Sequence, residues 1–216
     1  MKTAVQIDFD GTVTEEDVSF LLLDTYVGSV WREYLKEYTS GKIAVGAFNK
    51  KVFGMMKADR KNMTDLVLTS DRVKIRPGFK QLLDYCREKG LKVIIVSNGL
   101  TFYIEAIMEH LGINGIDIYA AENVFYPGGM NVRYLGPDGK ELETGFKEAF
   151  TDMMCKEGYA VIYVGNGTSD IYSSRKAKYV FATADLLKRC REEKLKCYPF
   201  NDFFDVINRL KKLDLG

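Results

Sequence analysis

Histidine is almost absent from this chain, since His110 stands alone among 216 residues. A single histidine cannot build a His-rich metal site, and mechanisms that use a histidine base become poor candidates. Cysteine is also scarce, and its spacing contains no CxxC pair, which disfavours a zinc site or a disulfide framework. The four cysteines are Cys86, Cys155, Cys190 and Cys197. Reduced thiols in a cytoplasmic protein are therefore our expectation.

Long apolar runs and an excess of one charge are missing as well. No stretch approaches the roughly 20 apolar residues that a membrane-spanning helix needs, and the start MKTAVQIDFD turns acidic too early for a signal peptide. The 31 basic and 30 acidic residues leave a net charge of +1, without the basic excess of a nucleic-acid binder. The basic run Lys188–Lys196 is interrupted by two glutamates, which is typical of a solvated helix face. We therefore expect no nucleic-acid or membrane partner.

Short apolar runs with β-branched residues indicate strands buried on both faces, as in a parallel sheet flanked by helices. Such runs are Ala4–Ile7, Leu91–Val96 and Ala160–Val164, and Lys178–Ala182 indicates a further strand. Helical patterns lie between and after them, at Pro77–Lys89, Leu100–Leu111, Phe146–Cys155 and Asp202–Leu210. This alternation predicts an α/β fold with a doubly wound parallel sheet.

Residues 15–72 interrupt the alternation, because they contain helical patterns only. These patterns cover Asp17–Val27, Trp31–Tyr38, Val45–Met56 and Met63–Leu68. We expect a small helical cap domain here, inserted into an α/β core made of residues 1–14 and 73–216. A second excursion, Asn123–Glu143, contains turn signals at Pro127–Gly129 and Pro137–Gly139 and predicts a β-hairpin flap.

Polar clusters follow three of the predicted strands, at the sheet edge where open α/β folds bind ligands. The first cluster contains Asp8, Asp10, Gly11 and Thr12. An aspartate is a competent nucleophile toward phosphorus, and a second carboxyl with a raised pKa is suited to move the proton of the leaving alcohol. Gly11 allows backbone N–H groups to approach a phosphate. The alternative is a plain strand-to-loop turn in which Asp8 only accepts backbone hydrogen bonds.

The other clusters offer ligands for a phosphate and a cation. Ser97 and Asn98 would present a hydroxyl and backbone N–H groups at a helix N-terminus, and a plain helix cap is an equal alternative. Lys147, near a helix start, is suited to neutralise a phosphate, although a lysine on a helix is usually solvated. The oxygen-rich loop Gly165–Asp170 suits Mg²⁺, and its alternative is a βα loop whose hydroxyls cap the next helix.

Together and in this order, these residues resemble the signature of the haloacid-dehalogenase-like phosphohydrolases, in their phosphoserine-phosphatase-like subgroup. The resemblance covers essentially the whole chain and implies catalytic roles for Asp8, Asp10 and Lys147. It implies phosphate binding by Gly11, Thr12, Ser97, Asn98 and Lys147, and Mg²⁺ binding by Asp8, Asp10, Asn166 and Asp170. The segment IRPGF and the tail KCYPFNDFFDVINRL are similar to the branch of methylthio-ketopentenyl-phosphate phosphatases, in which an acid corresponding to Asp17 follows the first motif.

Asn166 departs from the family pattern, which has an aspartate there as a direct Mg²⁺ ligand. An amide oxygen still binds the cation but brings no charge, so we expect weaker metal binding. The resemblance implies hydrolysis of a small phosphorylated metabolite through an aspartyl phosphate on Asp8. Phosphoserine hydrolysis, phosphotransfer, and a binding or regulatory protein with weakened chemistry are the alternatives. Phosphoserine would need a partner for its carboxylate, commonly arginine, where the segment Asn49–Lys51 has lysines.

Overall fold

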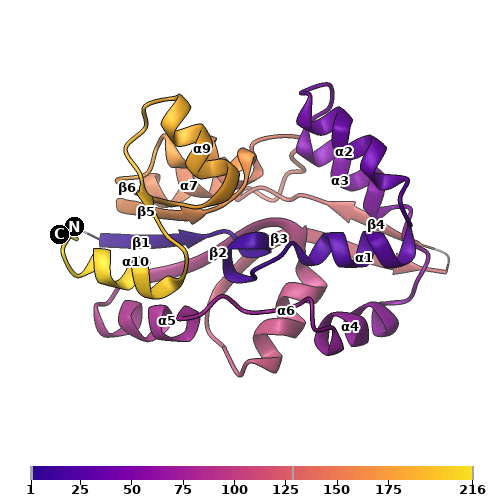
Figure 1. Cartoon of the computed structure of the whole chain (residues 1–216), viewed down its shortest axis with the longest axis horizontal. Coiled ribbons are helices and arrows are strands. Elements are labelled where there is room, and N and C mark those ends of the chain that lie inside the picture. The colour runs from indigo at the N-terminus through magenta and orange to yellow at the C-terminus, as the bar shows by residue number, and fades with distance from the viewer. Residues whose placement is uncertain (1, 128, 216) are drawn as a thin grey trace.

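The computed structural model describes residues 2–127 and 129–215, and a seven-stranded sheet lies at its centre (Figure 1). The strand order is β4-β3-β2-β1-β5-β6-β7, and all neighbours are parallel except β3 and β4. The strands are β1 (Lys2–Ile7), β2 (Lys92–Leu100), β3 (Asp117–Tyr126), β4 (Gly129–Arg133), β5 (Tyr159–Gly165), β6 (Tyr179–Ala182) and β7 (Tyr198–Pro199). The order changes direction beside β1, as in a doubly wound sheet, so the predicted fold class is confirmed.

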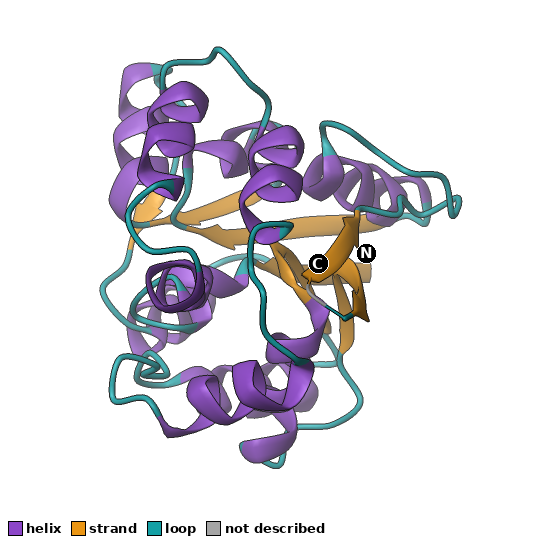
Figure 2. Cartoon of the chain, turned by 90° about the vertical axis from the view of Figure 1, so that its right-hand side faces the viewer, coloured by secondary structure: helices purple, strands orange, loops and turns teal. Residues whose placement is uncertain are grey.

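Helices cover both faces of this sheet, which explains why its central strands carry continuous apolar runs. α7 and α9 lie on one face, and α5, α6 and α10 lie on the other (Figures 1 and 2). The short helix α8 packs against α7 and α9. The bounds are α5 (Phe79–Glu88), α6 (Thr101–His110), α7 (Phe146–Lys156), α8 (Ile171–Ser174), α9 (Ala184–Glu192) and α10 (Phe203–Leu210).

Four helices occupy the segment that precedes α5: α1 (Val18–Tyr26), α2 (Trp31–Thr39), α3 (Val45–Phe53) and α4 (Arg60–Thr69). α3 contacts β4, and α4 contacts α6, so these helices lie over one end of the sheet (Figure 1). The chain enters and leaves this segment through paired backbones. Thr14 forms an antiparallel bridge with Ile75, and the Glu15 N–H donates to the Lys74 carbonyl at 2.8 Å. The division into a core and a cap domain stays a prediction.

β2 is longer than the sequence pattern predicts. It continues beyond Val96 to Leu100, and its pairing with β3 is irregular there, because Val96 pairs with Tyr119 while Leu100 pairs with Ala121. The extra residues form a bulge, which redirects side chains at a strand end. The predicted cluster Ser97–Gly99 therefore belongs to the end of the strand, and α6 begins only at Thr101.

The predicted hairpin is present as β3 and β4, which pair from Glu122 with Arg133 to Tyr126 with Gly129. Its first strand begins at Asp117 and is also part of the main sheet, which the sequence pattern did not indicate. The predicted turn at Pro127–Gly129 includes Gly128, and the predicted core includes Met1 and Gly216; these three positions lie outside the described residues. Within the described part of the chain, no helix has the length and apolar character to cross a membrane.

Candidate active site

The residues predicted for the site meet at the carboxyl edge of the sheet, where the strand order changes direction between β1 and β5. Asp8 directly follows β1, and its N–H donates to the Val164 carbonyl in β5 at 2.9 Å. Lys147 lies in the first turn of α7, which begins after Gly145 at a φ of 69°. A cavity of about 320 Å³ opens at this edge. The predicted residues that line it are Asp8, Asp10, Gly11, Ser97, Asn98, Lys147 and Asn166.

Lys147 bridges two carboxylates in the buried floor of the site. Its Nζ lies 2.6 Å from Asp8 Oδ1 and 2.6 Å from Asp170 Oδ1. Only about 5% of each of Asp8 and Lys147 is exposed, and Asp170 is fully buried. A buried charge is tolerated only when it is paired and hydrogen-bonded. The ammonium therefore neutralises two carboxylates that would otherwise repel each other in an environment with little water.

Asp170 lies behind Lys147 and does not line the cavity. Its Oδ1 also accepts a hydrogen bond from the Tyr163 hydroxyl at 2.7 Å, and its Oδ2 accepts from the backbone N–H groups of Asn166 and Gly167 at 3.0 and 2.8 Å. These bonds fold the loop after β5 back onto the carboxylate. The geometry therefore assigns Asp170 to holding Lys147 and the loop, and its predicted role in metal binding stays a prediction.

The charges around Asp8 act in opposite directions. Burial raises the pKa of Asp8 to about 7, the Lys147 ammonium opposes this rise, and the Asp170 carboxylate adds to it. Burial also lowers the pKa of Lys147, but the charges of Asp170 and Asp8 outweigh burial and raise that pKa above its ordinary value. Lys147 therefore remains a cation, and it is the partner that favours the ionised form of Asp8.

Asp10 lies in an environment that favours its protonated form. Its Oδ1 accepts a hydrogen bond from the Val18 N–H at 3.0 Å, and its Oδ2 accepts from the Tyr103 hydroxyl at 2.5 Å. Burial raises the pKa of Asp10 well above its ordinary value, and the carboxylate of Asp17 raises it further, while the Tyr103 hydrogen bond opposes the rise. Asp8 and Asp10 thus lie in different environments. Asp8 faces the Lys147 ammonium, whereas Asp10 faces the Tyr103 hydroxyl and the Asp17 carboxylate.

Ser97 and Asn98 occupy different positions around the cavity. The Ser97 hydroxyl donates to Asp10 Oδ2 at 3.4 Å and accepts from the Gly99 N–H at 2.9 Å. A Cβ atom on Gly99 would overlap the Tyr103 hydroxyl and Asp10, so the close approach requires glycine. The Asn98 side chain donates to the Ser169 hydroxyl at 3.2 Å, on the loop after β5.

Oxygen atoms suited to Mg²⁺ converge beside Asp8. The Thr12 hydroxyl donates to Asn166 Oδ1 at 3.1 Å and also lies 3.5 Å from Asp8 Oδ2, so these two side chains point to one region. Carboxylate, amide and backbone oxygens are the ligands that Mg²⁺ prefers. Among the described residues, no cluster of three or more His, Cys, Asp or Glu side chains is arranged to hold a metal ion. The donor set fits a hard cation, but it depends on the neutral Asn166 amide.

Helices α1, α2 and α3 and the segments beside them supply the opposite wall of the cavity. Its apolar and aromatic lining residues are Phe20, Leu35, Tyr38, Val45, Phe48 and Phe53, and its polar lining residues are Glu15, Asp17, Ser19, Thr39 and Asn49. The Asn49 side-chain amide on α3 donates to the Asn98 carbonyl at 3.0 Å and to the Tyr134 hydroxyl at 2.7 Å. Tyr134 also donates to the Asn98 carbonyl at 2.6 Å, so helix α3, the hairpin and β2 are joined above the site.

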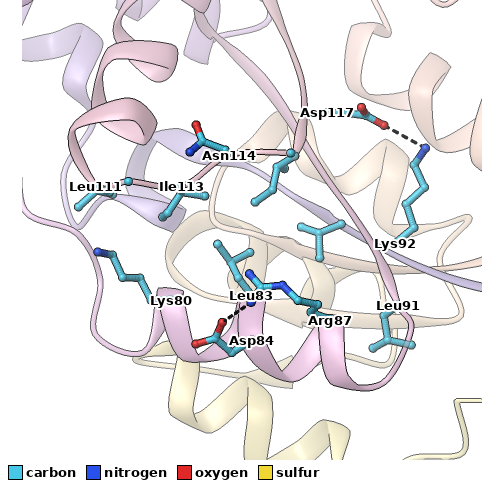
Figure 3. A pocket seen from close by; sticks show the side chains of 14 residues that line it. Lys80, Leu83, Asp84, Arg87, Leu91, Lys92, Leu111, Ile113, Asn114 and Asp117 are labelled. Carbon is cyan, nitrogen blue, oxygen red and sulfur yellow. Dashed lines mark hydrogen bonds and ion pairs between the residues drawn. The ribbon is translucent and has the colours of Figure 1, made fainter.

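A larger cavity, about 660 Å³, lies at the opposite edge of the sheet (Figure 3). Lys92 at the start of β2 and Asp117 at the start of β3 line it and form an ion pair at 3.0 Å. None of the residues predicted for catalysis lines it. Ligands of open α/β sheets bind beyond the carboxyl ends of the strands, so the smaller cavity is the candidate active site.

Several residues that shape the site were not found from the sequence: Asn49, Arg76, Tyr103, Tyr134 and Tyr163. Each is of a type that is common in ordinary cores and surfaces, and all except Tyr163 act through a partner distant in the chain; Tyr103 and Asp10, for example, are 93 residues apart. The segment IRPGF, which contains Arg76, was the one available signal, because its similarity to one branch was visible.

The chain is similar to known proteins over most of its length. A family model described as haloacid dehalogenase-like hydrolase matches residues 5–175. The 2-hydroxy-3-keto-5-methylthiopentenyl-1-phosphate phosphatase of Geobacillus thermodenitrificans is 29% identical over 220 residues, covering 96% of this chain and 95% of the relative. The Brevibacillus brevis protein of the same name is 26% identical over 216 residues, covering 98% and 96%. A substrate-bound phosphoserine phosphatase complex has a TM-score of 0.72 at 20% identity, covering 99% of both chains, which shows a shared fold.

Proposed function

Because the chain belongs to the haloacid dehalogenase-like hydrolases, we propose that it hydrolyses a small phosphorylated metabolite through a covalent phosphate on Asp8. The family resemblance seen in the sequence is confirmed, and with it the expectation of an enzyme that hydrolyses phosphoric monoesters. The observation that carries the covalent step is the position of Asp8: it lines the cavity, and its carboxylate is paired with Lys147, which Asp170 holds from behind.

Asp8 acts as the nucleophile in this proposal. Its carboxylate oxygen forms a bond to phosphorus, the bond from phosphorus to the substrate oxygen breaks, and an aspartyl phosphate results. Water then attacks the phosphorus and releases inorganic phosphate and the free Asp8 carboxylate. Lys147 supports both steps, because its ammonium favours ionised Asp8 and neutralises the charge of the incoming phosphate.

Asp10 acts as the acid and base. Burial and the Asp17 carboxylate raise its pKa and favour its protonated form, so it is suited to donate a proton to the leaving alcohol. The carboxylate produced then accepts a proton from the attacking water. Tyr103 and the Val18 N–H hold the carboxyl group in one orientation through both steps.

The cation site belongs to the same proposal. Asp8, the backbone carbonyl of Asp10 and Asn166 would hold Mg²⁺, and the bound ion would supply positive charge that neutralises the phosphate and the carboxylates. Asn166 Oδ1 accepts a hydrogen bond from the Thr12 hydroxyl at 3.1 Å, which keeps the amide oxygen aimed at the Asp8 side of the loop.

The substrate class follows from the wall that faces the carboxylates. Among the described residues that line the cavity, Lys147 is the cationic side chain, and it is already paired with two carboxylates. Phosphoserine carries a carboxylate that would need a further cation. An uncharged leaving group with an apolar chain, such as the methylthio-ketopentenyl group in the names of the relatives, fits the apolar side chains of this wall better, and the acidic Glu15 and Asp17 in the lining also disfavour a substrate carboxylate.

A phosphate-release assay tests the proposal. With Mg²⁺ present, we expect turnover of p-nitrophenyl phosphate and of an uncharged aliphatic phosphomonoester, and a lower kcat/KM for phosphoserine. EDTA should stop turnover. An absence of phosphate release from every ester would contradict the proposed reaction, whereas a preference for phosphoserine would contradict the proposed substrate class alone.

A further inference from the structure

Arg76 follows the point where the chain returns from the cap helices to the core, and its guanidinium binds the loop that follows Asp8. Nε donates to the Thr12 carbonyl and Nη2 donates to the Gly11 carbonyl, both at 2.8 Å. Nη1 donates to the Asn201 carbonyl, also at 2.8 Å. A single half-buried side chain thus joins two consecutive peptides of this loop to the segment before α10.

These hydrogen bonds hold the two peptides that follow the conformationally free residue Gly11. Gly11 has a φ of 71°, and glycine reaches many backbone conformations that other residues do not. A Cβ atom at this position would overlap the Asn166 side chain, so another residue type cannot stiffen the loop. The loop therefore requires glycine at this position because there is no space for a side chain. Its rigidity must come from outside the loop, and the planar Arg76 guanidinium supplies it through two hydrogen bonds to carbonyl oxygens.

The direction of the carbonyls sets the direction of the neighbouring N–H group. In a trans peptide the C=O and N–H point in opposite directions, and the described residues contain no cis peptide. With the Gly11 carbonyl directed at Arg76, the Thr12 N–H points away from Arg76. Gly11 lines the cavity and Arg76 does not, so the guanidinium holds the loop from the side opposite the cavity.

We propose that Arg76 is a positioning residue of the phosphatase reaction: it orients the Gly11–Thr12 peptide so that its N–H faces the transferred phosphoryl group. This inference rests on the proposed function. The backbone of the same residue strengthens the arrangement, since the Arg76 N–H donates to the Val13 carbonyl at 2.8 Å. The guanidinium carbon also lies over the ring of Phe200, 5.7 Å from its centroid, so the aromatic ring packs against the side chain.

The test compares Arg76→Ala and Arg76→Lys with the full-length wild-type chain, using p-nitrophenyl phosphate and Mg²⁺. A misplaced donor near the reacting atoms can reduce turnover by about 100-fold, and we expect a kcat loss of that order for Arg76→Ala. Lysine keeps the charge but cannot match two carbonyls with a planar fork, so Arg76→Lys should also lose kcat. Arg87→Ala is the control, because Arg87 pairs with Asp84 at 3.1 Å beside the remote cavity (Figure 3).

Added methylguanidinium separates positioning from general support of the fold. It should restore part of the kcat of Arg76→Ala without changing its melting temperature, whereas a residue that only stabilises the fold would show no such rescue. A folded Arg76→Ala or Arg76→Lys chain with the wild-type kcat would overturn the inference and leave the proposed function standing. A wild-type chain without turnover would contradict the proposed function itself.

Discussion

Replacing Lys147 by methionine is the perturbation that tests the buried charges most directly. Methionine keeps much of the side-chain volume and removes the ammonium that lies 2.6 Å from both Asp8 and Asp170. With an effective dielectric constant of about 20, Coulomb's law gives an attraction of roughly 6 kcal/mol for each contact. Most of this attraction offsets the cost of burying the charges, so removing one partner of a buried pair costs about 3–5 kcal/mol.

This loss should be visible as a lower melting temperature in metal-free buffer. For a chain of this size, each kcal/mol lowers the melting temperature by about 2–4 °C, which gives a decrease of roughly 6–20 °C, measured by circular dichroism. Lys176→Met is a matched control, because Lys176 also bridges two carboxylates, Glu148 and Asp152, at 2.7 Å, but 37% of its side chain is exposed. An exposed pair contributes about 0–1 kcal/mol, so the control should change little.

The pH dependence of the Lys147→Met variant has a defined sign. The pKa of Asp8 is already raised to about 7 by burial, and loss of the ammonium that opposes burial should raise this pKa further. When the pKa of a carboxyl is raised in the folded state, the folded protein has its full stability below the unfolded-state pKa of that group. This stability is lost as the pH rises through the folded-state pKa, because the buried carboxyl then becomes charged. The decrease in melting temperature of Lys147→Met relative to the wild type should therefore be smaller near pH 5 than near pH 8. Equal melting temperatures for the two methionine variants at every pH would refute this account of the buried charges.

Three further substitutions test individual roles in the proposed reaction. Asp8→Asn should abolish turnover with the fold intact by circular dichroism, because the nucleophile is lost; normal activity would reject the covalent mechanism. Asp10→Asn should still form the aspartyl phosphate from p-nitrophenyl phosphate, giving a burst followed by slow turnover, because a good leaving group needs no acid; unchanged steady-state turnover without a burst would remove Asp10 from this role. Asn166→Asp should lower the Mg²⁺ concentration that gives half-maximal rate, because it adds a charge worth a few kcal/mol at about 4 Å; a metal titration with no difference would show that Asn166 is not a ligand.

Much of the fold was predictable because local pattern encodes it. β1 and β5 read as continuous apolar runs, since helices cover both of their faces. β3 does not read as such a run, because its buried residues are only Ala120 and Ala121, its other residues are partly or fully exposed, and it lies next to the edge strand. The end of β2 was misplaced for a different reason: a bulge is a property of its pairing with β3, and the polar residues Ser97–Gly99 carry no strand pattern.

The sequence by itself determined which chemical groups are available at the carboxyl edge of the sheet. Asp8 and Asn166 each follow an apolar run, and the ends of parallel strands meet at one edge. Only the tertiary structure decided what those groups experience. Burial and the neighbouring Asp17 raise the pKa of Asp10, and the carbonyls of Gly11 and Thr12 reach Arg76 across more than sixty residues. Electrostatic energies depend on distance and solvent exposure, and neither quantity exists until the chain has folded.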